Sequence, residues 1–332
     1  MLFRSCMKQR GLIDLHLHLD GSLSVASVRE LAAMQDISVP VDDRELLEKL
    51  QVGPDCRDLN EYLEKFDFPC SLMQTEAAIT KAVSNLCTEL AAQGLLYAEI
   101  RFAPQFHTGQ GLTQTQVVQA AVAGLNPDVF RANLILCCMR GNGNHAENLE
   151  TVEVAAQFLG KGVCAVDLAG AEALFPTADF EDLFRLAAQK GVPYTIHAGE
   201  ADGCGSVRTA LSFGTGRVGH GVRSMEEPAL VRHLAAEGVT LELCPTSNLN
   251  TSIFEKLADY PLMELMSAGV RVTVNTDNMT VSGVTLESEM EKLAQTFPLT
   301  DAHFKALARN AANASFASRE DKDWMLARIE EM

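Results

Sequence analysis

Eight short apolar segments bounded by glycine or proline constrain the fold of this chain more than any other feature. They are Leu12–Leu19, Tyr97–Pro104, Arg131–Met139, Val163–Gly170, Pro193–Glu200, Arg217–Val222, Thr240–Ser247 and Arg271–Asn278. Several are apolar almost throughout, which is typical of parallel strands covered on both faces. From the second onward they begin about 29 residues apart, the length of one strand plus one crossover helix. This repeat predicts an α/β fold, a (β/α)8 barrel of the TIM type, with an open doubly wound sheet as the alternative.

Helical patterns occupy the spaces between these segments. Apolar residues recur three and four positions apart over Glu76–Gln93, Asp179–Lys190, Pro228–Glu237 and Leu257–Ala268. Each pattern is followed by a glycine, the usual left-handed terminator of a helix, at Gly94, Gly191, Gly238 and Gly269. The sequence therefore predicts strands that alternate with crossover helices.

Two departures from this alternation are expected. About 85 residues separate the starts of the first two strands, so extra helices are predicted above the barrel mouth, over Val25–Asp36, Glu45–Leu50 and Leu59–Phe66. After Asn278 the chain is predicted to be helical to its end. No linker or internal repeat divides the sequence, so we expect an N-terminal tail at residues 1–11 and a single barrel domain at residues 12–332.

Composition excludes several classes of partner. The 44 acidic and 27 basic residues give a formal net charge of −17, which disfavours binding to the phosphate backbone of nucleic acid. No apolar run reaches the roughly 18 residues of a membrane span, so no membrane association is expected. The nine cysteines are an odd number without a C-x-x-C pair, which indicates reduced thiols and a cytoplasmic location. A small-molecule ligand is the expected partner, and no oligomeric state is predicted.

Histidines and carboxylates gather at the predicted carboxyl ends of the strands, where barrel enzymes build their active sites. His16 and His18 are two residues apart in the first strand, so both point into the barrel, and Asp20 continues the row. His197 ends the fifth strand and Asp277 ends the eighth. Three imidazoles and a carboxylate fit one divalent metal, most often zinc, with a position left for water.

Two more residues at strand ends suit acid–base chemistry. Glu200 lies three residues after His197, and His220 lies in the sixth strand. The other four histidines are expected on the surface: His107, His145, His233 and His303. His145 and Glu147 match one half of a cytidine-deaminase zinc motif, but the P-C-x-x-C half is absent, so we interpret that match as chance.

The motifs IDLHLHLDGSL, EYLEKF, YAEIRFAP, VDLAG, IHAGE, GHG, LCPTSN and NTDN occur in this order. Together they resemble the adenosine deaminase family of the amidohydrolase superfamily. The resemblance covers most of the chain and implies a barrel with one Zn²⁺ ion per chain. Dinuclear amidohydrolases use a carboxylated lysine in strand four, and VCAVDLAG contains no lysine, in agreement with a mononuclear site.

The resemblance also implies roles for individual residues. The zinc ligands would be His16, His18, His197 and Asp277. Glu200 would protonate ring nitrogen 1 of a purine, His220 would orient and deprotonate the attacking water, and Asp277 would steer it. Such an acid must hold a proton when water attacks, and a buried pocket favours this by raising the pKa of the carboxyl.

Further positions match the family's contacts with its substrate. By resemblance, His18 and Asp20 lie near the ribose, and Gly170 offers a backbone donor to ring nitrogen 3. An apolar gate over the pocket is formed by Tyr62, Leu63 and Phe66. Many members have two aspartates where this chain has Asp277 followed by Asn278. Ring nitrogen 7 only accepts hydrogen bonds, and an asparagine amide donates at any pH, so the change is compatible with a purine.

The predicted function is zinc-dependent hydrolysis of adenosine or deoxyadenosine to inosine or deoxyinosine and ammonia, in purine salvage. Within the family, the alternatives are deamination of adenine or of modified adenine nucleosides. A non-catalytic purine-binding protein on the same fold is disfavoured because Glu200 and the other acid, base and ligand positions are present. A hydrolase of unrelated substrates such as phosphoesters is disfavoured because no basic pocket is evident.

Overall fold

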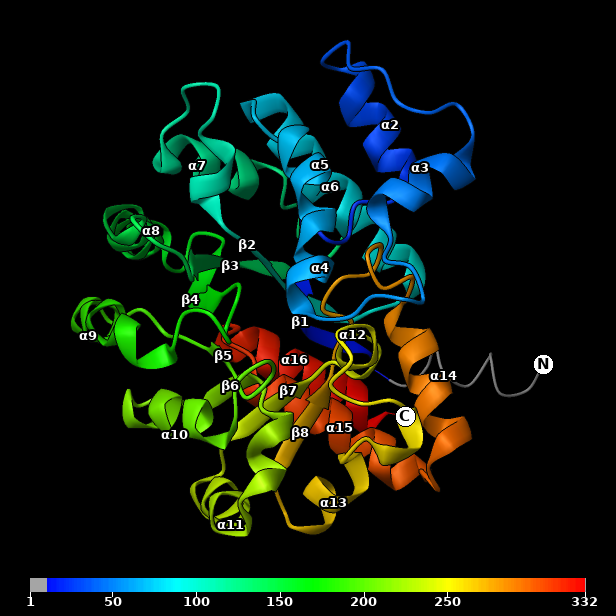
Figure 1. The fold of residues 1–332 in the computed structure, drawn as a ribbon, viewed down its shortest axis with the longest axis vertical. Coiled ribbons are helices and arrows are strands. Elements are labelled where there is room, and N and C mark those ends of the chain that lie inside the picture. The colour runs from blue at the N-terminus through cyan, green and yellow to red at the C-terminus, as the bar shows by residue number, and fades with distance from the viewer. Residues whose placement is uncertain (1–10, 332) are drawn as a thin grey trace.

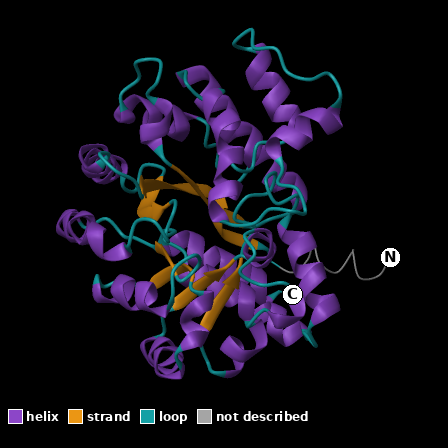
Figure 2. Cartoon of the chain, viewed as in Figure 1, coloured by secondary structure: helices purple, strands orange, loops and turns teal. Residues whose placement is uncertain are grey.

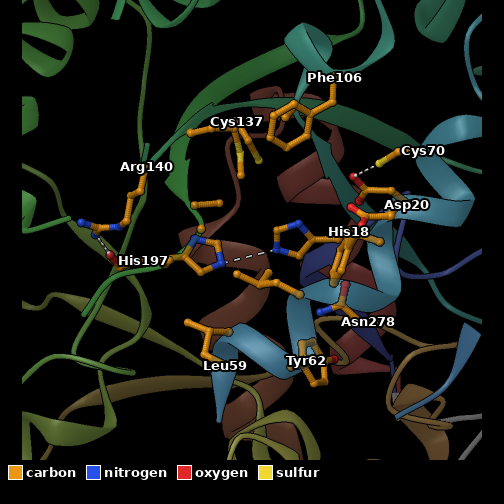
Figure 3. A pocket seen from close by; sticks show the side chains of 18 of the residues that line it. His18, Asp20, Leu59, Tyr62, Cys70, Phe106, Cys137, Arg140, His197 and Asn278 are labelled. Carbon is orange, nitrogen blue, oxygen red and sulfur yellow. Dashed lines mark hydrogen bonds between the residues drawn. The ribbon is translucent and has the colours of Figure 1, made fainter. Parts of the chain in front are cut away.

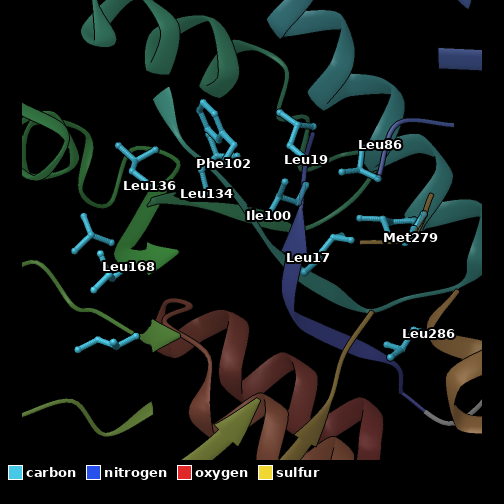
Figure 4. Packing of buried hydrophobic residues seen from close by; sticks show 14 of the residues in the cluster. Leu17, Leu19, Leu86, Ile100, Phe102, Leu134, Leu136, Leu168, Met279 and Leu286 are labelled. Carbon is cyan, nitrogen blue, oxygen red and sulfur yellow. The ribbon is translucent and has the colours of Figure 1, made fainter. Parts of the chain in front are cut away.

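Strand β1 (Ile13–His18) shows how the sequence pattern builds the core. Leu17 and Leu19 alternate with His16 and His18, and successive side chains of a strand point to opposite faces. The two leucines are fully buried in the main hydrophobic cluster between strands and helices. Figure 4 shows them beside residues of β2 and of the helical layer. The histidines face the opposite way, into the barrel.

The computed structural model describes residues 11–331, and within them eight parallel strands form two four-stranded sheets, β1-β2-β3-β4 and β5-β6-β7-β8. The remaining strands are β2 (Tyr97–Phe102), β3 (Ala132–Met139), β4 (Val163–Ala169), β5 (Ile196–Ala198), β6 (Arg217–His220), β7 (Thr240–Leu243) and β8 (Arg271–Val274). Figure 2 shows these strands at the centre of the molecule with helices outside them.

Isolated bridges join the two sheets at both seams. Leu17 pairs with Asp277, and the backbone N–H of His18 donates to the Asp277 carbonyl at 2.7 Å. At the other seam Val166 pairs with Tyr194. The ring of strands is therefore closed, and the predicted (β/α)8 barrel is confirmed.

Helices α7, α8, α9, α10 and α11 follow one another around the outside of the strands (Figure 1). The helices between β1 and β6 are α2 (Val25–Ala33), α3 (Asp43–Leu50), α4 (Leu59–Leu63), η1 (Glu64–Phe66), α5 (Asp67–Ser71), α6 (Glu76–Gln93), η2 (Pro104–His107), α7 (Gln114–Ala123), α8 (His145–Phe158), η3 (Thr177–Phe180), α9 (Glu181–Lys190) and α10 (Cys204–Ser212). Those after β6 are η4 (Val222–Glu226), α11 (Pro228–Glu237), α12 (Pro245–Asn250), η5 (Leu257–Asp259), α13 (Leu262–Ser267), α14 (Leu286–Thr296), α15 (Asp301–Ala314) and α16 (Arg319–Glu330).

The structure corrects several predicted boundaries. The seventh strand ends at Leu243, because Pro245 occupies the first turn of helix α12. The helix predicted over Leu257–Ala268 is broken at Pro261, which separates η5 from α13. The chain after Asn278 forms three helices rather than one, each with a side-chain cap at its start. The predicted tail lies outside the described residues apart from Gly11.

A network of buried charges fills the barrel beneath the histidines. Arg101 of β2 donates to Asp167 at 2.8 Å and to Glu242 at 2.9 Å, and all three side chains are fully buried. Arg217 of β6 forms ion pairs with Glu242 and Glu99. Branched apolar residues usually fill such a barrel. Here the paired charges occupy its interior, and they reach up to the histidines.

Among residues 11–331, no helix is both long enough and apolar enough to span a lipid bilayer.

Candidate active site

A cavity of about 770 Å³ opens at the carboxyl ends of the strands (Figure 3). Its size is within the range of sites for small molecules. Eleven of the twelve residues singled out in the sequence line it: His18, Asp20, Tyr62, Leu63, Phe66, Gly170, His197, Glu200, His220, Asp277 and Asn278. The twelfth, His16, is fully buried and contacts the lining residues Asp277 and His197.

Three imidazoles and one carboxylate converge at one point of this cavity. One ligand atom from each of His16, His18, His197 and Asp277 lies within 4.8 Å of the other three. The Nε2 atoms of His16 and His18 are each 3.4 Å from Asp277 Oδ1. His16 Nε2 is buried and has no hydrogen-bond partner within the described part of the chain. Such an orphaned nitrogen in a set of three imidazoles and a carboxylate fits a divalent cation.

Two of these imidazoles are oriented by buried carboxylates behind them. His16 Nδ1 lies 2.7 Å from Glu242 Oε2, and His197 Nδ1 lies 2.8 Å from Asp167 Oδ2. A carboxylate behind one ring nitrogen holds the proton there and leaves the other nitrogen free to bind a metal. The charge network of the barrel interior therefore sets the orientation of His16 and His197.

The protonation states of His18, His197 and Asp277 suit a cation, whereas the pKa of His16 is raised, because the opposing effects of burial and Arg101 are outweighed by Asp277 and Glu242. Burial lowers the pKa of His18 and of His197, so both rings are neutral at neutral pH. Burial opposes ionisation of Asp277, but the His16 ring 3.4 Å away holds the pKa of that carboxyl far below its usual range. Neutral imidazole and ionised carboxylate are the forms that bind metals.

Glu200 has the environment of an acid that keeps its proton. Its side chain is buried, and Oε1 has no hydrogen-bond partner among residues 11–331. Burial raises the pKa of this carboxyl well above its usual range, and the negative charges of Asp277 and Glu172 raise it further, against the effect of Arg140. Its Oε2 lies 3.5 Å from His220 Nε2.

Asn248 and Tyr260 hold His220 through Nδ1, the ring nitrogen that does not face Glu200. Asn248 Nδ2 lies 3.1 Å from His220 Nδ1, and the Tyr260 hydroxyl donates to Asn248 Oδ1 at 3.0 Å. Burial lowers the pKa of His220 well below its usual value. The ring is thus neutral, and its Nε2 faces Glu200.

Two of the clustered residues have strained backbones. His220 has φ of +57° and Asp277 has φ of +59°, a left-handed conformation that is uncommon for residues other than glycine. Strain of this kind collects at functional sites, where the surrounding structure holds it in place. A Cβ on Gly219, beside His220, would be crowded, because it would lie 3.1 Å from His16 Cε1 and 3.2 Å from the backbone of His197.

Glu172 fixes the loop that carries Glu200. Its carboxylate accepts four consecutive backbone N–H groups, from residues 199 to 202, at 2.7 to 3.0 Å. It also accepts the hydroxyl of Ser206 at 2.6 Å. Five hydrogen bonds to one buried carboxylate determine the path of the loop and place a negative charge near Glu200.

Comparison with known proteins agrees with this geometry. The sequence model described as adenosine deaminase matches residues 12–332. The chain belongs to the adenosine deaminase family. It is 48% identical to an adenosine deaminase of Haemophilus ducreyi, over 98% of this chain and 97% of that protein. An adenosine deaminase of Enterococcus faecalis is 38% identical, with 98% of each chain covered.

Solved structures share the fold. The crystal structure of adenine deaminase from Arthrobacter aurescens superimposes with a TM-score of 0.87 at 31% identity, covering 97% of this chain and 98% of the other. An amidohydrolase from Burkholderia ambifaria, solved with bound Zn, has a TM-score of 0.87 at 20% identity, and the match covers 100% of this chain and 93% of the amidohydrolase chain. At this identity the match shows a shared fold alone. The alternative of an open doubly wound sheet is excluded.

The structure brings the family motifs into one cavity and corrects one prediction about histidines. His107 is 1% exposed rather than on the surface, and its Nδ1 lies 3.0 Å from the Met73 carbonyl. It ends η2 and packs against the Phe102 ring, a contact that no periodic signal in the sequence reveals. His145 is more than half exposed, as expected.

Several residues of the site were not singled out from the sequence. Charged residues inside otherwise apolar strands were a usable signal for Arg101, Asp167 and Glu242, because burying a charge demands a partner. Glu172 and Asn248 lie outside the strands, and their local sequence gives no such signal. Only the fold shows that these two residues support Glu200 and His220.

Proposed function

We propose that this protein hydrolyses adenosine and deoxyadenosine to inosine and deoxyinosine with release of ammonia, using one Zn²⁺ per chain. The observation that carries the proposal is the position of Glu200, a buried carboxyl whose Oε2 lies 3.5 Å from His220, at the edge of a cluster of three imidazoles and a carboxylate. Hydrolysis of a 6-aminopurine needs this combination, because attack of water on carbon 6 drives negative charge onto the ring.

His16, His18, His197 and Asp277 would hold the metal. When bound, a divalent metal at such a site acts as a Lewis acid and lowers the pKa of water toward 7. The mononuclear assignment agrees with strand β4, which contains no lysine. The zinc-bound amidohydrolase of the same fold supports the choice of Zn²⁺.

The chain's own groups account for the proton transfers. Glu200 donates its proton to ring nitrogen 1 as water adds to carbon 6. His220 would hold the attacking water and accept its proton, with the amide of Asn248 turned so that its oxygen accepts from His220 Nδ1–H and leaves Nε2 free, and Asp277 would steer the oxygen. His220 then passes the water proton to the amino nitrogen, and the bond from carbon 6 to that nitrogen breaks as ammonia leaves. The hydroxyl on carbon 6 returns a proton to Glu200 as the carbonyl of inosine forms. Positioned proton transfer contributes roughly 10² to 10⁴ in rate.

The remaining residues of the cavity would bind the nucleoside. Asn278 would donate its amide to ring nitrogen 7, the Gly170 backbone would contact ring nitrogen 3, and His18 and Asp20 would face the ribose. Tyr62, Leu63 and Phe66 of α4 and η1 line the same cavity and would cover the purine. Gly21 permits the approach of Asn278, since a Cβ on Gly21 would overlap the Asn278 side chain.

Adenosine is favoured over adenine because the adenosine deaminase of H. ducreyi shares more sequence with this chain than the adenine deaminase of A. aurescens, 48% against 31%. The eight cysteines among residues 11–331 are all free, which supports a cytoplasmic enzyme of purine salvage.

Absorbance-monitored turnover of adenosine, deoxyadenosine and adenine by metal-replete protein tests the proposal. We expect kcat/KM for the two nucleosides to exceed that for adenine. Elemental analysis of the dialysed protein should give one equivalent of Zn²⁺ per chain. Preference for adenine would overturn the substrate assignment, and two tightly held equivalents would overturn the mononuclear site.

A further inference from the structure

Three ligand-type side chains outside the proposed zinc cluster meet on the side of the cavity formed by α5. Asp20 follows β1, Cys70 lies in α5 and His107 ends η2. One ligand atom of each lies within 4.8 Å of the other two. Cys70 Sγ is 3.6 Å from Asp20 Oδ2. Figure 3 shows Cys70 and Asp20 paired on the wall of the cavity. None of these three residues belongs to the zinc cluster.

Two atoms of this group are buried with their hydrogen-bonding capacity unused. Asp20 Oδ1 and His107 Nε2 have no hydrogen-bond partner in the part of the chain that the structure describes. Asp20 is 5% exposed and His107 is 1% exposed. A buried polar atom without a partner destabilises the fold. Binding of a cation by these atoms would remove that destabilisation.

The hydrogen bond behind His107 decides which ring nitrogen is free. Its Nδ1 lies 3.0 Å from the carbonyl oxygen of Met73. A carbonyl only accepts hydrogen bonds, so Nδ1 carries the proton and Nε2 keeps its lone pair. A backbone carbonyl behind the far nitrogen is the usual support for a metal-binding histidine.

We propose that Asp20, Cys70 and His107 form a second metal site, which takes up Zn²⁺ or Cd²⁺ when these ions are in excess. Thiolate, imidazole and carboxylate are together a ligand set of zinc-like ions, and Mg²⁺ and Ca²⁺ prefer oxygen ligands. Thiolate and carboxylate neutralise the charge of the ion. Asp20 and Cys70 line the cavity, so water there completes the coordination.

Occupancy of this site has a consequence for the enzyme. The ion stands in the wall of the cavity in which the nucleoside is proposed to bind, and it engages Asp20, which is assigned to the ribose end. Excess Zn²⁺ is therefore expected to compete with substrate. This consequence rests on the proposed function, but the binding of the ion does not.

Metal binding by the holoenzyme tests the site directly. The protein is equilibrated with increasing Cd²⁺ in thiol-free buffer, and the total of Zn²⁺ and Cd²⁺ per chain is measured by elemental analysis. We expect two equivalents, the second with an ultraviolet thiolate-to-Cd²⁺ charge-transfer band. Loss of a partner behind a ligand weakens metal binding by roughly 10- to 100-fold. Cys70→Ser and His107→Gln, which each remove a ligand, should weaken the second equivalent at least as much.

Two matched variants serve as controls. Cys204 is likewise half-buried, and His145 is an exposed histidine. Cys204→Ser and His145→Gln should keep the second equivalent and the absorption band. Retention of both by Cys70→Ser, or saturation of the wild type at one equivalent, would overturn the site. Cys70→Ser is a small change, so it tests the site even if His107→Gln fails to fold.

Kinetics tests the consequence. Added Zn²⁺ should raise KM for adenosine without lowering kcat in the wild type, and at least tenfold more Zn²⁺ should be needed in Cys70→Ser. Equal inhibition of the two proteins would overturn the link between the site and the cavity. Absence of adenosine turnover in any protein would instead refute the proposed function, and the binding experiment would still decide the site.

Discussion

Glu172 holds Glu200 in place through the backbone, because its carboxylate accepts the Glu200 N–H at 2.9 Å together with three neighbouring N–H groups. Burial and the charge of Asp277 raise the pKa of Glu200, and the negative charge of Glu172 raises it further. A residue outside the strands thus fixes the position of the proposed acid and contributes to its protonation.

Glu172→Gln should lower kcat/KM for adenosine and shift its pH profile. The acid must be protonated, so activity is lost as the pH rises through the pKa of Glu200. Removing the charge of Glu172 lowers that pKa, and the alkaline limb of kcat/KM should move to lower pH. Glu181→Gln, an exposed change at the start of α9, should leave the profile unmoved. A uniform loss at every pH would show that Glu172 acts on loop geometry alone.

Glu200→Gln should bind adenosine and metal yet lose most of its turnover. The amide keeps the shape of the side chain but cannot deliver a proton, so kcat should fall by roughly 10² to 10⁴. Stopped-time product assays together with metal analysis check this, with the exposed Glu255→Gln as control. A near-normal kcat would remove Glu200 from the mechanism.

The hydrogen bond from Asn278 to ring nitrogen 7 should determine how kcat/KM for adenosine depends on pH. Asn278→Asp is expected to stay active at low pH, where the carboxyl holds a proton, and to lose kcat/KM as the pH rises and a carboxylate faces an acceptor. An unpaired buried acceptor costs roughly 1–3 kcal/mol, or about 5- to 150-fold. Asn278→Ala should lose a similar factor at all pH values.

An analogue without nitrogen 7 separates this contact from a structural role. 7-Deazaadenosine should be a poor substrate of the wild type. Its kcat/KM should be nearly the same in Asn278→Ala as in the wild type. If the alanine variant loses the same factor on adenosine and on the analogue, Asn278 merely shapes the loop after β8.

Arg101→Leu should destabilise the protein strongly. It would remove the arginine partner of Asp167 and leave Glu242 with Arg217 as its arginine partner in the barrel interior, and breaking a buried pair costs roughly 3–5 kcal/mol. Denaturant unfolding at neutral pH measures the loss. Arg185→Leu is the matched control. It removes only an exposed pair with Glu181, and exposed pairs contribute roughly 0–1 kcal/mol. A loss under about 1 kcal/mol for Arg101→Leu would contradict the prediction.

The same network predicts the acid stability of the wild type. Burial opposes ionisation of both carboxyls. The His197 ring and Arg101 nevertheless hold the pKa of Asp167 below its usual range, and Arg217 and Arg101 do the same for Glu242. Carboxyls with depressed pKa values stabilise the fold above the pKa of about 4 that they have when unfolded, and this contribution is lost as the pH falls. The free energy of unfolding should therefore fall below about pH 4. An unchanged value down to pH 2 would contradict this.

The sequence by itself determined the barrel and the residues gathered at its mouth. Strand and helix alternate because apolar runs and helical spacing repeat about every 29 residues, and this information is local in the sequence. His16 and His18 share a face because the strand period is two. Errors arose where tertiary contacts override pattern, as at Pro245, where an apparent strand end begins helix α12.

Only the tertiary structure decided what supports those residues. Glu172 meets the loop of Glu200 across about 28 residues of chain, and Glu242 meets His16 across 226. Nothing local in the sequence encodes either contact. The pairing of Cys70 with Asp20 likewise depends on how helix α5 lies over the end of β1. Local propensity sets which residues form strands and helices. Closing the barrel brings distant buried polar atoms together, and these must find partners because burial without one is costly.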